Sequence, residues 1–139
     1  MRTTIIQNLT ARFSAYSTLA NQVADQAIAE RLETPKHKSL GEHLWCVVGA
    51  RESYSKALTA GEWVGFNCSM DKFERGDFAH SLEISAQAVL ESIENIEDWT
   101  PARDELLANL YEHEVMHEGQ IIRHMYGMDR AMPGSWKWA

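Results

Sequence analysis

Two histidines four residues apart, His113 and His117, carry the clearest chemical signal in the chain. Side chains at positions i and i+4 of a helix lie on one face, about one turn apart, so two imidazoles at this spacing can bind one cation. The apolar stripe that contains them, with Leu106, Leu110 and Ile121, has helical periodicity. We therefore expect this face to point inward, where polar groups need partners and a metal ion is one such partner.

A third ligand is expected from another helix at a similar depth. The helix predicted to follow Ser39 offers His43 and Cys46, which are three residues apart and so lie on one face. Either would complete a three-ligand site with an open position for water or substrate, the pattern of catalytic rather than structural zinc. Imidazole and thiolate donors favour zinc, nickel or another late divalent metal over magnesium or calcium. The pattern names no catalytic acid or base.

A different interpretation fits the same spacing. The histidine pair lies among Glu112, Glu114 and Glu118, and a solvated, charge-laced helix face would have this sequence too. His124 continues the stripe and is expected to be a hydrogen-bonded structural histidine rather than a ligand.

Four amphipathic helices are predicted and no strand. The first runs from about residue 4 to 31, the second opens at a Ser39–Glu42 capping box and stops near Gly61, the third starts near Asp77, and the fourth opens at Thr100-Pro101 and runs to about residue 126. The long connection between the second and third is expected to be a crossover that its aromatic residues fold down onto the bundle, which is compatible with a second role as a substrate lid. The sequence therefore predicts one all-α domain over residues 1–139, a four-helix bundle.

The overall charge and hydrophobicity of the chain limit the classes of partner that it is expected to bind. Net charge is −7, from 13 basic and 20 acidic residues, which argues against nucleic acid or an anionic membrane surface. No run of 18 apolar residues exists, and the N-terminus does not have the pattern of a signal peptide, so the expected location is the cytoplasm. In that reducing compartment, Cys46 and Cys68 are expected to be free thiols or ligands rather than a bridge.

The run from His113 to Gln120 resembles the His-x-x-x-His-x-Gly-Gln signature of the DinB/YfiT-like superfamily. The segment from Ser39 to Gly49 resembles that family's second helix, and Pro133-x-Ser135-Trp136 is similar to the tails of some members. The resemblance covers nearly the whole chain. It implies a four-helix bundle, often a homodimer, with a divalent metal held by three histidines; Trp136 and Trp138 are candidates for dimer contacts.

The family's first metal histidine aligns with Cys46 and not with His43. Three outcomes follow: Cys46 binds as a thiolate, His43 replaces it from one turn earlier, or the site is incomplete. The resemblance implies metal-dependent enzymes that act on small molecules, either transferases that use a low-molecular-weight thiol as co-substrate or hydrolases. The alternatives are a metal-free bundle that serves as a dimerisation or interaction domain, and a thiol protein based on Cys46.

Overall fold

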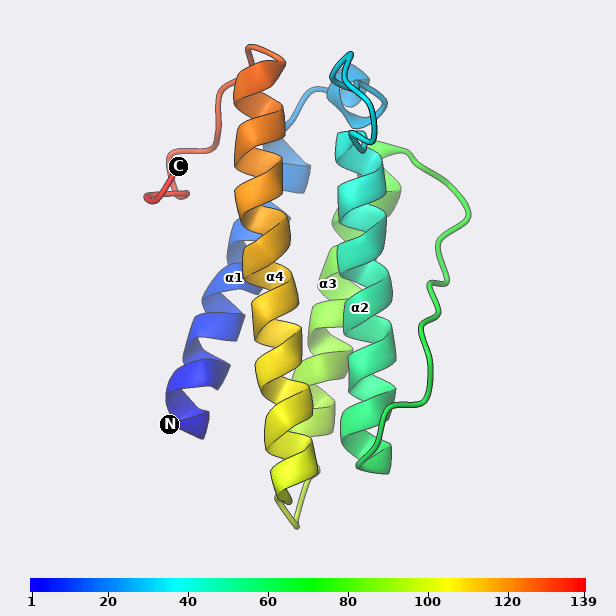
Figure 1. Ribbon diagram of the computed structural model, residues 1–139, viewed down its shortest axis with the longest axis vertical. Coiled ribbons are helices and arrows are strands. Elements are labelled where there is room, and N and C mark those ends of the chain that lie inside the picture. The colour runs from blue at the N-terminus through cyan, green and yellow to red at the C-terminus, as the bar shows by residue number, and fades with distance from the viewer.

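The computed structural model describes residues 1–139 and confirms the all-α four-helix bundle (Figure 1). The elements are α1 (Arg2–Gln22), the short 3₁₀ helix η1 (Asp25–Ile28), α2 (Leu40–Ala60), α3 (Arg75–Glu94) and α4 (Pro101–Gly127). No helix has the length and apolar character that crossing a membrane would require.

Helices α1 and α4 run in one direction and α2 and α3 in the other (Figure 1). Each of α1 and α2 packs against both α3 and α4. Because α2 and α3 are parallel neighbours, residues 61–74 must return along the whole bundle. A 21-residue helix such as α2 is about 31 Å long, which explains the length of this connection.

Aromatic side chains hold this connection against α2, as the sequence predicts. The ring of Phe66 packs on Trp45, and that of Trp63 packs on Tyr54, with centroids 5.5 and 4.9 Å apart. Gly49 permits the approach, because a Cβ atom there would lie 2.4 Å from Phe66 Cζ. The connection is therefore a packed crossover along the outside of α2.

The ends of α2 and the start of α4 follow the predicted signals. Ser39 and Glu42 form the full capping box, Gly61 ends α2 in the left-handed region with φ 83°, and the Thr100 side chain accepts a hydrogen bond from the backbone N–H of Arg103. Helix α3 begins at Arg75, two residues before the expected start.

The expected first helix is wrong in about its last third, from Val23 to Arg31. Helix α1 ends at Gln22 because Val23 and Ala24 are extended, with ψ near 145°. The chain then turns through η1 and buries Ile28, which is 3% exposed and lies against Gly41 of α2. Burial of this apolar group outweighs the helical periodicity that continues in the sequence.

The C-terminal tail closes one side of the bundle. Trp136 is 3% exposed, its indole N–H donates to the carbonyl of Ala15, and its ring meets Tyr16 edge-on. Trp138 stays half exposed, with the guanidinium of Arg12 3.9 Å from its ring centroid. Trp136 is therefore a core residue of this chain, and is not free to contact a second copy.

Candidate metal centre

Helices α2 and α4 bring four histidines to one cavity. They are His43 from the first turn of α2, and His113, His117 and His124 from α4. His43, His117 and His124 are buried, and His113 is partly exposed. The spacing of the three on α4, four and then seven residues, places them along one face of the helix.

The imidazoles contact one another directly. Nδ1 of His43 lies 3.1 Å from Nδ1 of His117, so one ring donates and the other accepts. The ring centroids of His113 and His117 are 4.5 Å apart, and those of His43 and His124 are 6.3 Å apart. Two nitrogens bound to one tetrahedral zinc at about 2.0–2.1 Å would be roughly 3.3 Å apart, close to the His43–His117 separation.

The structure distinguishes the two candidates from the second helix. His43 is the one that hydrogen-bonds His117. Cys46 lines the same cavity, half-buried, and its sulfur accepts a hydrogen bond from Lys38 Nζ at 3.1 Å. Cys68 packs in the long connection instead, where its thiol donates to the Trp45 carbonyl.

Burial keeps the histidines neutral near pH 7. It lowers the pKa of His43 and of His113 to about 4, with the positive charge of Lys38 as the next cause. It lowers the pKa of His117 to about 3, helped by the neighbouring rings of His113 and His43. Neutral imidazole is the form that binds a metal ion, so these rings need not lose a proton first.

Two buried ring nitrogens have no hydrogen-bond partner, Nδ1 of His113 and Nδ1 of His124. Buried polar atoms are rarely left without one, and a cation is a partner that would satisfy them. As the side chains lie, no three donors converge on one point closely enough to hold a metal ion. Histidine χ2 is a soft torsion, so rotating a ring is the adjustment that a three-histidine site requires. The donor set fits zinc or nickel.

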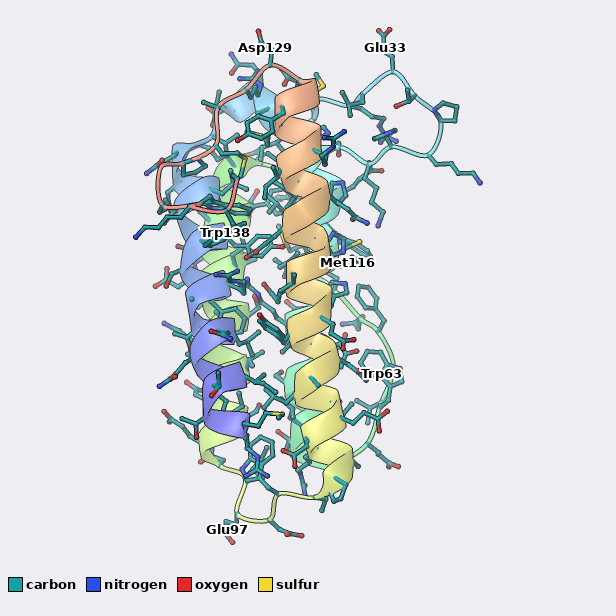
Figure 2. The ribbon with its side chains drawn as sticks, turned by 60° about the vertical axis from the view of Figure 1, so that its left-hand side comes forward. Glu33, Trp63, Glu97, Met116, Asp129 and Trp138 are labelled. Carbon is teal, nitrogen blue, oxygen red and sulfur yellow. The ribbon has the colours of Figure 1, made fainter.

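The cavity has a volume of about 710 Å³, within the range of small-molecule sites. The buried histidines His43, His117 and His124 form its floor, with the partly exposed His113 beside them. Met116, labelled on α4 in Figure 2, lines its wall with Cys46 and Gly119. The exposed rim comes from α4 and from the loop before α2, and consists of Lys36, His37, Lys38, Gln120 and Arg123.

The glutamates around the histidine pair do not form a solvated face. Glu114 is fully buried, and both its oxygens accept hydrogen bonds from Arg51, at 2.7 and 2.8 Å. Arg51 also donates to the carbonyl of Leu82, so this side chain ties α2 to both α3 and α4. The pair fixes how α4 is turned against α2, and hence how its histidines face His43.

Glu118 is also buried and lies away from the cavity. One of its oxygens accepts a hydrogen bond from Arg12 and the other has no partner. Burial raises the pKa of Glu118 to about 7, and the positive charge of Arg12 opposes that shift. Of the three glutamates near the histidine pair, only Glu112 is exposed, so the charge-laced interpretation is wrong for this helix.

The sequence did not point to the rim residues Lys36, Lys38 and Arg123, and it placed His124 among the structural histidines. His124 is expected to be hydrogen-bonded, yet its Nδ1 has no partner and its ring lines the cavity. Its place on the same stripe as His117 was a usable signal. Lys36 and Lys38 lie in the loop before α2 and carry no helical pattern, so nothing in the sequence pointed to them.

A comparison with models of known protein families finds no match to this chain, and a comparison with curated proteins finds none either.

Proposed function

We propose that this protein is a divalent-metal-dependent enzyme acting on a small molecule, with the metal held by His43, His113 and His117. The observation that carries the proposal is the 3.1 Å contact between His43 and His117 on the floor of an open cavity. A buried imidazole packs no better than an apolar side chain and costs more to desolvate. The contact between His43 and His117, next to ring nitrogens that have no hydrogen-bond partner, therefore supports a set of metal ligands.

Held by three imidazoles, a divalent ion would keep a coordination position for water or substrate. It would supply Lewis acidity and lower the pKa of a bound water or thiol. His124 lines the same cavity, and burial lowers its pKa, which favours the neutral ring near pH 7. These features support transfer to or from a thiol co-substrate, or hydrolysis. The resemblance to the DinB/YfiT-like superfamily supports the same proposal.

The test is activity that depends on the metal and on the histidines. Metal-free protein is reconstituted separately with zinc, nickel, manganese and iron. It is then assayed for hydrolysis of esters and amides, and for transfer of a low-molecular-weight thiol to electrophiles. We expect one reaction to appear only with metal, to be lost in His117→Gln and to persist in Cys46→Ser. Activity of the metal-free wild type, or of His117→Gln with unchanged circular dichroism, would refute the proposal.

The Lys38–Cys46 contact supports a second candidate, thiol chemistry at Cys46. A cation 3.1 Å from a sulfur stabilises negative charge that develops there. This candidate predicts that Cys46 reacts with iodoacetamide faster than Cys68 and that Lys38→Met slows only Cys46. Equal rates at the two cysteines would refute it.

A further inference from the structure

The rim of the cavity is basic, although the protein as a whole is acidic. Lys36, His37, Lys38 and Arg123 line the opening, and no aspartate or glutamate lines any part of the cavity. The whole chain carries 20 acidic and 13 basic residues, so a cavity lining with basic residues and no carboxylate has the opposite charge balance to the chain. A recess lined by one sign of charge concentrates ligands of the opposite sign.

The three permanent cations at the rim have no anionic partner in the protein. None of Lys36, Lys38 and Arg123 takes part in an ion pair. The nearby carboxylates are engaged elsewhere: Glu42 pairs with Arg31, and Glu30 with Arg130. Glu33, at the tip of the loop before α2, points away from the helices (Figure 2).

The loop before α2 brings Lys38 to the cavity that the histidines line. Lys36 has φ 65°, a left-handed conformation that non-glycine residues seldom adopt. Lys38 Nζ donates a hydrogen bond at 3.1 Å to the sulfur of Cys46, which lines the same cavity as the histidines. The loop thus holds a positive charge at this cavity.

The floor itself has an unsatisfied polar group. His124 is 3% exposed, lines the cavity, and has no partner for its Nδ1. The protein alone therefore leaves a buried polar atom unsatisfied in the wall of this cavity.

We propose that the cavity binds a small organic anion, whose carboxylate or phosphate group lies between Lys38 and Arg123 and whose body lies against the histidine floor. The inference deepens the proposed function and rests on it in one respect. Neutral imidazoles do not offset the charge of a divalent ion, and no carboxylate is present to do so, so a metal-loaded site favours an anion at its open position. The rim cations favour the same ligand without the metal.

The test is a calorimetric titration of succinate and, separately, of inorganic phosphate into zinc-loaded and metal-free protein at constant ionic strength. The variants are Lys38→Met and Arg123→Gln, and the matched control is Lys56→Met, which removes an equally exposed charge from α2 outside this cavity. The three side chains are exposed, so these variants keep the fold. Zinc content is measured on every sample.

We expect saturable binding in both forms, tighter with zinc. The dissociation constant should rise about threefold to tenfold in Lys38→Met and in Arg123→Gln, and stay unchanged in Lys56→Met. The anion that binds more tightly identifies the acid group. Absence of saturation in both forms, or equal weakening by Lys56→Met, would overturn the inference. A protein that takes up no zinc would instead contradict the proposed function, and the metal-free titration would still decide the inference.

Discussion

The buried ion pair between Arg51 and Glu114 gives a prediction whose size follows from the structure. Both side chains are 0% exposed and form two charge-assisted hydrogen bonds, at 2.7 and 2.8 Å. Replacing Glu114 with glutamine keeps the shape and leaves Arg51 as a buried cation without a counter-charge. Breaking such a pair costs about 3–5 kcal/mol, because the remaining charge stays desolvated.

Urea unfolding followed by circular dichroism measures this cost. With a slope of about 1.5 kcal/mol per molar urea, the midpoint of Glu114→Gln should fall by roughly 2–3 M. The matched control is Arg2→Gln. It breaks the Arg2–Asp104 pair, which has nearly the same geometry at 2.7 and 3.0 Å but side chains 39% and 45% exposed. Water screens that pair, so its loss should barely move the midpoint.

A double variant tests the reason for the cost. Arg51→Met combined with Glu114→Met removes both charges and keeps most of the volume, so the double variant should be more stable than Glu114→Gln. If Glu114→Gln unfolds at the same urea concentration as Arg2→Gln, the argument that desolvation dominates here is wrong.

Burial of His43 makes the metal-free protein sensitive to acid, because its folded pKa of about 4 lies below the ordinary value of 6.5. Between pH 6.5 and 4 the unfolded chain binds a proton at His43 and the folded chain does not. The free energy of unfolding is therefore highest above pH 6.5 and falls as the pH drops through 6.5 toward 4. Between about pH 7.5 and 5 this loss amounts to about 2 kcal/mol. Urea unfolding at the two pH values should show a smaller loss in His43→Gln; an equal loss would contradict this assignment. Gly49→Ala should destabilise the protein and speed proteolysis within residues 61–74, because the new Cβ would collide with the ring of Phe66. This outcome is expected even though alanine favours a helix over glycine by about 1 kcal/mol. Phe66→Ala should reverse the effect, and a stabilised Gly49→Ala would show that the connection is not held there.

Local signals predicted most of the fold. The Ser39–Glu42 box, the turn at Gly61 and the Thr100 cap depend on neighbours within a few residues, and each lies where expected. The end of α1 at Gln22 could not be predicted from neighbouring residues. It depends on the burial of Ile28 against Gly41 and Phe78, which come later in the chain.

The candidate site was predictable only where it depends on local helical spacing. Helical spacing places His113 and His117 on one face, but it cannot say which helix faces them or how that helix is turned. The choice of His43 for contact with His117 depends on packing between α2 and α4, which Arg51 and Glu114 fix from within the core. Arg51 continues the helical spacing of Leu44 and Val47, so its inward position follows from the sequence. The burial of Glu114 does not, because Glu114 has the pattern of a surface residue.

The number of metal ions bound per chain tests the central proposal most directly. Protein without an affinity tag is loaded with zinc, desalted and measured by elemental mass spectrometry, beside His43→Gln, His117→Gln and Cys46→Ser. We expect close to one ion per chain in the wild type and in Cys46→Ser, and little in either histidine variant. A wild type that retains no ion, or an ion that persists in His43→Gln and is lost in Cys46→Ser, would contradict the three-histidine site.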